Sequence, residues 1–178
     1  PVVATVVVVS LGVGIGVNTA VFSWVQAMYL QPLPGVAGAG RMYLVEPRSD
    51  TGSYPGASWL EYLDLKQRLT SLPDLFAYRM VAFNVGERGH VERTYGQFVS
   101  GNYFSALGLS PALGRFLRPV DTATAGGEPV VIVSYDYWQT RFNGSPEVLG
   151  RTIRVNELPL TVIGVAPTGF QGTVLMLK

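Results

Sequence analysis

The sequence contains no cysteine and only one histidine, His90, among its 178 residues. Without cysteine the chain has no disulfide, no thiolate metal ligand and no cysteine nucleophile. One histidine without a second histidine or a cysteine cannot build a zinc site of the common kinds. The lack of disulfides leaves the compartment open, because many extracytoplasmic domains also lack cysteine.

Charge is absent from the first forty residues, although the chain carries 13 Lys and Arg and 12 Asp and Glu, the first at Arg41. At about 1.5 Å per residue, a helix over Val2–Leu30 exceeds the roughly 30 Å of bilayer hydrocarbon. Pro32 and Pro34 end such a helix, because each lacks a backbone donor and restricts the residue before it. We therefore predict a transmembrane helix over residues 1–31.

Two alternatives to a membrane helix fit this stretch less well. Gly12 and Gly14 could open a dinucleotide-binding turn, but Val17 stands where that fingerprint needs a small residue. The acidic residue expected about twenty positions on is also missing, since the first acid is Glu46. A cleaved secretory signal is the second alternative, and its apolar core is shorter than this one.

Small residues recur along the predicted helix. Gly12, Gly16 and Ala20 are spaced by four and share one face, which lets two helix backbones approach closely. Asn18 lies on a roughly opposite face, where it can hydrogen-bond to a neighbouring helix. Glycine is also simply common in membrane helices. The pattern favours a helix packed among others over a lone anchor.

The sequence lacks the signatures of two functional classes, ATPases and nucleic-acid-binding proteins. No Gly-x-x-x-x-Gly-Lys-Ser/Thr motif occurs, so the chain has no phosphate-binding loop and is not itself an ATPase. The formal net charge is +1, and the charges are interspersed without a basic stripe. Nucleic acid is therefore not an expected partner.

The rest of the chain reads as an α+β fold. The sequence predicts a connector over 32–40 and then a domain over 41–178, with a lobe boundary at 118–129. Ser58 and Glu61 form a capping-box pattern that starts a largely buried helix reaching Leu69, and Pro73 opens a shorter helical turn over 74–78.

Strands and further helices are expected at fixed places. Hairpins are predicted over 81–99 and over 152–165, the second with Asn156–Pro159 as its turn. Strands are also predicted at 42–45 and 130–133, short helices at 101–108 and 135–142, and a loop over 111–129.

No catalytic, cofactor or metal residue is identified. His90 is expected to be an exposed strand residue, and Asp121 and Glu128 are better explained by a solvated loop than by paired carboxylates. Asn143-Gly144-Ser145 is formally a glycosylation triplet, but a turn accounts for it. Core packing rather than a ligand cage explains the aromatic residues Trp59, Tyr62, Phe76, Tyr103, Phe104, Trp138 and Phe142.

A set of segments, in order along nearly the whole chain, resembles the MacB-like permeases of ABC transporters, most of all the large bacterial permeases with a duplicated MacB-like region. One departure is Glu157, where the family usually has glycine in a hairpin turn. The segments are 11–23, 30–34, Gly101–Gly108, 111–115, 134–138, Arg141-Phe142, 148–153 and 162–167.

The resemblance implies an FtsX-like permease subunit in the bacterial inner membrane, with residues 41–178 on the extracytoplasmic side. A separate ABC ATPase would hydrolyse ATP, and the external core domain would move in response, for efflux or mechanotransmission. Membrane lipid and other helices of the same permease are the implied partners, and the resemblance admits a homodimer. The family's core domain continues past Lys178, so we expect a fragment whose strands lack partners.

Two other classes remain as hypotheses. A membrane-anchored cell-surface binding module would have one helix and no further hydrophobic spans downstream. A membrane-tethered hydrolase would need a nucleophile beside a base, and the sequence offers no clear base. We expect no enzyme activity and no cofactor.

Overall fold

The computed structural model describes residues 2–29, 36, 42–45, 48–49, 52–53, 56–87, 90–123, 127 and 129–173. The chain separates into two compact units, Pro1–Pro34 and Gly35–Lys178. Each unit is described by itself. Helix and sheet are mixed, which confirms the α+β prediction.

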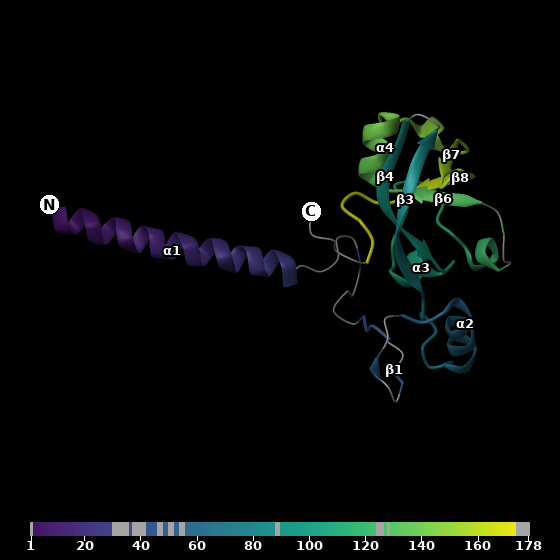
Figure 1. Ribbon diagram of the computed structural model, residues 1–178, viewed down its shortest axis with the longest axis horizontal. Helices are drawn as coiled ribbons and strands as arrows, with labels where there is room; N and C mark the ends of the chain where they lie inside the picture. Colours follow the sequence, from purple (N-terminus) through teal and green to yellow (C-terminus); the bar gives the residue numbers. More distant parts are fainter. Residues whose placement is uncertain are drawn as a thin grey trace. The chain divides into compact units, whose positions relative to one another are not determined.

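The first unit is one helix, α1, over Val2–Tyr29 (Figure 1). Its segment Val2–Ser23 is long and apolar enough to cross a membrane, and none of that segment is buried in the structure. The Thr19 hydroxyl donates to the Ile15 carbonyl at 2.8 Å, so this polar group has its partner within the helix. An apolar helix whose backbone hydrogen bonds are internal suits a lipid environment.

The second unit opens with the short hairpin β1–β2 and continues with helices placed between strands (Figure 1). The strands are β1 (Arg48–Ser49), β2 (Gly52–Ser53), β3 (Tyr78–Glu87), β4 (His90–Val99), β5 (Leu113–Gly114), β6 (Val130–Val133), β7 (Thr152–Val155) and β8 (Leu158–Val165). The helices are α2 (Trp59–Arg68), α3 (Tyr103–Ala106), α4 (Tyr135–Phe142) and the 3-10 turns η2 (Pro119–Thr122) and η3 (Pro146–Val148).

The six-stranded sheet has the order β4-β3-β7-β8-β5, with β6 paired in parallel to β8. The long β3–β4 hairpin joins the remaining strands through one narrow contact, the pair Val85 and Val155. Beside that pair, the backbone N–H of Asn156 donates to the backbone carbonyl of Asn84 at 2.8 Å. The side-chain oxygen Oδ1 of Asn156 accepts from the backbone N–H of Asn84 at 2.9 Å. Two asparagines therefore fasten the hairpin to the rest of the sheet.

The helix starts follow from their capping residues. Ser58 accepts from the Glu61 amide at 3.2 Å, and Glu61 accepts from the Ser58 amide at 2.6 Å, which confirms the predicted capping box of α2. Ser134 caps α4 in the same way, with its side chain accepting from the Tyr137 amide. Asn143 ends α4 in the left-handed conformation, at a φ of 50°.

An aliphatic cluster forms the core of the part of the sheet near α4. Val133, Val148, Val162 and Val165 are all buried, and half-buried side chains of β5, β6, β7 and α4 pack against them. At Gly164 a Cβ would stand 2.1 Å from the Arg115 carbonyl oxygen, so β5 and β8 approach as closely as glycine allows. Branched side chains on adjacent strands make this cluster compact.

The β7–β8 hairpin turns in two residues rather than the four that we predicted. Asn156 and Glu157 both have positive φ, 48° and 67°, and Val155 pairs directly with Leu158. This is the backbone of a type I′ turn, which matches the twist of the flanking strands. Glycine is the residue favoured at the second of these positions, and glutamate occupies it here.

Several sequence predictions are wrong in detail. Residues 42–45 belong to no strand, and residues 74–78 form no helical turn, since β3 begins at Tyr78. The stretch 111–129 is not only loop, because it contains β5 and η2. Pairing with neighbouring strands, which the sequence does not reveal, set the start of β3 and formed β5.

One prediction about burial and one about strand pairing are also wrong. Only Tyr62 is buried on α2, while Trp59 and Leu60 are exposed by 47% and 76%. The runs 130–133 and 160–163, which we expected to lack partners, pair with each other as β6 and β8.

Candidate functional site

The described residues contain no group of three or more His, Asp and Glu side chains able to hold a metal ion. His90 begins β4, as predicted, but its side chain lies outside the described part of the chain, as does Glu128. The expectations that His90 is exposed and that Glu128 belongs to a solvated loop therefore remain predictions. Polar groups gather at three places in the described residues.

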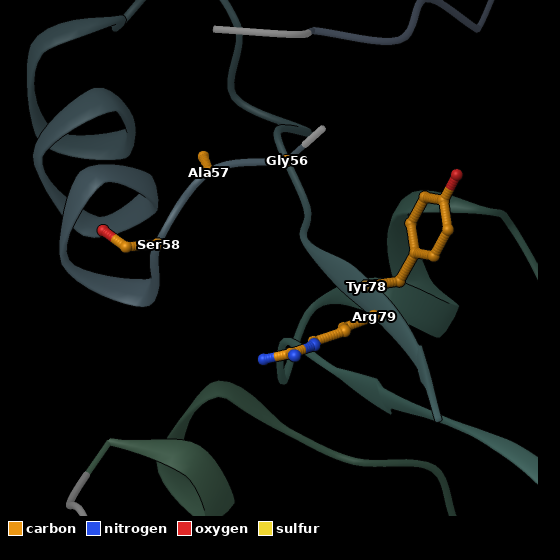
Figure 2. Close-up of a pocket in the computed structure, with 5 residues that line it drawn as sticks. All are labelled: Gly56, Ala57, Ser58, Tyr78 and Arg79. Atoms are coloured by element: carbon orange, nitrogen blue, oxygen red, sulfur yellow. The ribbon is translucent and has the colours of Figure 1, made fainter. Parts of the chain in front are cut away.

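The first is a cavity of about 380 Å³ between the start of α2 and the start of β3. Figure 2 shows the five lining residues, Gly56, Ala57, Ser58, Tyr78 and Arg79, with Arg79 directed toward the space and the Tyr78 ring turned away. The hydroxyl and amide of Ser58 both serve the capping box of α2. Among these five described residues the charged group is Arg79, and none is a nucleophile beside a base.

The second place is Asp121 in η2, whose side chain is only 6% exposed. Arg115 Nη1 donates to its carboxylate at 2.6 Å and Nη2 at 3.3 Å, and the Arg118 amide donates at 2.8 Å. These hydrogen bonds, first from Arg115 and then from Arg118, lower the pKa of Asp121 from 3.8 to about 2. Our prediction of a solvated loop carboxylate is wrong here, because the neighbouring arginines hold Asp121 inward.

The ion pair has a structural task. At Gly101 a Cβ would stand 2.5 Å from the Arg118 carbonyl oxygen and 2.7 Å from Pro119 Cα, so η2 lies directly on the backbone that precedes α3. The pair of Arg115 and Asp121 fixes the loop that carries η2 at this close approach. Local sequence does not reveal it, because Arg115 and Asp121 share no helix or strand whose repeat would place them side by side.

The third place is Tyr103 in α3, which is 1% exposed. Its hydroxyl lies 2.9 Å from Gln97 Oε1 and 3.2 Å from Thr173 Oγ1, and it accepts from the Thr173 amide at 3.1 Å. Burial, the largest effect, raises the pKa of Tyr103 above its ordinary value of 10, so the phenol stays protonated at neutral pH. The ring is surrounded by aromatic side chains, those of Phe76, Tyr78, Phe104 and Phe170.

The predicted core aromatics divide into two groups. Tyr62, Tyr103 and Phe104 are buried, as expected, whereas Trp59 is exposed and Phe76, Trp138 and Phe142 are half-buried. The Trp138 indole donates to the Ser145 carbonyl at 2.8 Å, and the turn at 143–145 serves this contact. Packing thus explains the buried aromatic side chains.

The small-residue stripe of α1 lies open. A Cβ at Gly12 or Gly16 would meet nothing within 4 Å, and every α1 residue whose burial is described is exposed. Partners for Gly12, Gly16 and Ala20 remain a prediction, as do partners for Asn18.

Comparisons with known proteins address the whole chain. The family model of the MacB-like periplasmic core domain matches residues 4–177. No curated protein matches the chain. Among solved structures, the chain is similar to the extracellular domain of the noncanonic ABC-type transporter YknZ from Gram-positive bacteria, at 18% identity and a TM-score of 0.54, covering 64% of this chain and 59% of that one.

A second similar structure is the periplasmic region of MacB from Actinobacillus actinomycetemcomitans, at 23% identity and a TM-score of 0.42, covering 53% of this chain and 42% of that one. The chain thus spans less than two thirds of the length of either solved domain. The family match extends over nearly every residue, the membrane-length helix included. This chain belongs to the MacB-like periplasmic core domain family.

Proposed function

We propose that this chain supplies a membrane helix and the extracytoplasmic core domain of an ABC-type permease subunit. One observation carries the proposal: a single chain joins a membrane-length apolar helix to a MacB-like core domain. The similar extracellular domain of YknZ comes from a noncanonic ABC-type transporter, which supports the same function.

In this proposal the chain transmits motion and does not catalyse. The sequence holds no phosphate-binding loop, so a separate ABC ATPase hydrolyses ATP and the external domain moves in response. The movement serves efflux or mechanotransmission. Lipid and other helices of the same permease surround α1, and a second copy of the permease is an admissible partner.

The decisive experiment follows amide hydrogen exchange in residues 35–178 of the full permease, in lipid nanodiscs with the ATPase that co-purifies with it. We expect exchange in the core domain to change with ATP, and to stay unchanged with an ATPase variant that binds ATP without hydrolysing it. If ATP changes hydrogen exchange nowhere in residues 35–178, the chain is instead a binding module on a membrane anchor.

Topology provides a second test, helped by the absence of native cysteine. Val120→Cys and Leu158→Cys place single thiols at side chains that are 67% and 64% exposed. A membrane-impermeant maleimide should label both in intact spheroplasts. Labelling only after the membrane is permeabilised would put the domain on the cytoplasmic side.

The small-residue stripe gives a third test. Gly16→Leu should weaken assembly of the permease helices, because its side chain blocks close backbone approach while the helix stays apolar enough to insert. Val17→Leu is the matched control, since it adds bulk beside the stripe. Equal assembly of both variants, measured in membranes, would remove the packing role of the stripe.

A further inference from the structure

Helix α2 carries three exposed apolar side chains that lie together. Trp59 is 47% exposed, Leu60 76% and Leu63 37%. Side chains three or four positions apart on a helix are neighbours, so Leu63 adjoins both of the others. Figure 1 shows α2 at one end of the domain and α4 at the other. Apolar side chains gathered on one exposed face, unlike single ones, mark a surface that binds a partner or a membrane.

The other side of α2 is fixed to the domain by Tyr62, which is 6% exposed. The Tyr62 hydroxyl lies 3.4 Å from the Leu75 carbonyl oxygen and 3.2 Å from Asn102 Oδ1. The Trp59 ring packs beside the Tyr62 ring, with the two centroids 5.0 Å apart. Because the helix and its indole are already held in place, a contact made by the exposed face orders little further and costs little conformational entropy.

The charged side chains of α2 are satisfied close to the helix. Arg68 Nε donates to Asp64 Oδ1 at 2.7 Å, and Lys66 Nζ donates to the Tyr62 hydroxyl at 3.1 Å. The remaining acid, Glu61, serves in the capping box. An ion pair carries no net charge, so α2 offers a partner an apolar surface rather than a charged one.

A bilayer fits this face better than a protein surface does. Three side chains cover far less than the about 800 Å² that each partner contributes to a standard protein interface. Lipid contact needs no such area, because the membrane-length helix α1 holds the same chain at a bilayer in the function proposed above. Residues 30–58 join α1 to α2, and an extended chain of that length reaches at most about 100 Å. The bilayer is thus present at high effective concentration, and a weak contact suffices.

The residue types also suit the membrane surface. Indole rings favour the boundary between water and hydrocarbon, and leucine side chains enter the outer part of the acyl layer. Resting on the function proposed above, we propose that Trp59, Leu60 and Leu63 form a lipid-docking face, which rests in the interfacial layer of the extracytoplasmic leaflet. This face gives the core domain a membrane attachment in addition to α1.

The first test compares two exposed leucines in the full permease in lipid nanodiscs. Leu60→Cys and Leu158→Cys replace side chains that are 76% and 64% exposed, one in α2 and one in the β7–β8 turn. The sequence has no native cysteine, so in a permease cleared of other thiols each bimane label reports one site. We expect phospholipid with a nitroxide high on its acyl chain to quench the label at 60 at least about twofold more than the label at 158. Equal quenching would overturn the lipid-docking face.

Iodide, which stays in water, separates lipid from a protein surface. We expect the label at 60 to be shielded from iodide and quenched by the nitroxide lipid. A label shielded from both quenchers would lie against protein, which would replace the lipid by a protein partner and overturn the proposal. A label at 60 that iodide reaches as freely as one at 158 would lie in water, and this result would overturn it too.

A substitution tests the three side chains as one face. With the label moved to Leu63→Cys, the further change Leu60→Ser should lower nitroxide quenching at least about twofold, because apolar area is lost. Leu158→Ser is the matched control and should leave the quenching unchanged. Both leucines are exposed, so equal melting temperatures should show that both variants keep the fold. Undiminished quenching in the Leu60→Ser variant would contradict a shared face.

Lipid charge provides a separate check. Because the charges of α2 are paired, exchanging phosphatidylcholine for phosphatidylglycerol should change the quenching at 60 by less than about twofold. A much larger rise in the anionic lipid would show that charge brings the domain to the membrane. The contact would then not belong to Trp59, Leu60 and Leu63, and the proposal would fail.

A label in α1 distinguishes failure of this proposal from failure of the permease function. Val13→Cys lies within the membrane-length segment Val2–Ser23, and nitroxide lipid should quench a label there. If the label at 13 is quenched and the label at 60 is not, the lipid-docking face is wrong and the permease function stands. If the label at 13 is not quenched, α1 does not lie in the bilayer and the permease function itself is wrong.

Discussion

Two clusters of buried side chains lie in residues 35–178, and they differ in residue type and in sequence range. The aliphatic cluster consists of Val133, Val148, Val162 and Val165, all within about thirty residues of sequence. The aromatic cluster around Tyr103 draws its members from residues 76 to 170.

The difference lies in what joins the segments. Strand ladders connect β6, β7 and β8, so the aliphatic cluster forms on a backbone framework that neighbouring segments already fix. In the aromatic cluster, ring contacts and the Tyr103 hydroxyl connect one end of the β3–β4 hairpin to α3 and to loops far apart in sequence. Side-chain contacts reorganise more readily than a ladder, so the aromatic end is the part of the domain suited to movement.

Phe104 offers the strongest test of whether the two clusters are independent. Its ring stacks on Phe116 at 4.1 Å and lies edge-on to Tyr103. Phe104→Ala should lower the free energy of unfolding by about 3–5 kcal/mol, through lost burial and the cavity left behind. Hydrogen exchange should accelerate in α3 and around Phe170 before it does so in β8. Equal acceleration of β8 would show that the two clusters form one cooperative unit.

Gly164→Ala tests the aliphatic end. Its new methyl group would stand 2.1 Å from a backbone oxygen that has no room to move without shifting β5, and we expect a loss of about 3 kcal/mol. Gly150→Ala is the matched control, since it meets open space at a φ of 80° and should cost only about 1 kcal/mol of backbone strain. Thermal unfolding of the detergent-solubilised protein measures both, and similar shifts would disprove the close contact.

Asp121→Asn weakens the link between η2 and α3 with a smaller effect, about 1–2 kcal/mol, because charge-assisted hydrogen bonds are lost. The native pair also predicts a pH dependence. The folded-state pKa is about 2 against an ordinary 3.8, so the stabilisation is complete above pH 4 and is lost as pH falls from about 4 to 2. The difference in stability between native protein and variant, followed by denaturant unfolding, should therefore shrink in that window and stay constant above it.

The smallest expected effect is an increase in stability. Glu157→Gly removes a side chain from a φ of 67° and should raise stability by about 0.5–1 kcal/mol. Asn156→Gly in the same turn should lower it, because Asn156 Oδ1 accepts from the Asn84 amide that fastens β3 to β7. Opposite signs of the two shifts in melting temperature are the test, and two gains would exclude a role for the asparagine.

Elements with local signals could be predicted from the sequence. The apolar run of α1, the Ser58 and Glu61 capping box and the two hairpins each depend on residues close together in the chain. Residues 42–45 show the limit of this reasoning, because a four-residue apolar run fits a strand but forms one only if a partner edge is available.

Contacts between distant segments were decided only by the tertiary structure. Asp121 looked like a solvated loop residue until Arg115 and Arg118 were placed around it, and Thr173 meets Tyr103 across seventy residues. The sequence by itself determined the segments with strong local signals, namely α1, α2 and the two hairpins, and that α1 suits a bilayer, because those depend on spacing and apolarity. Which side chains meet is set by chain packing, since bringing such segments together is a property of the whole fold.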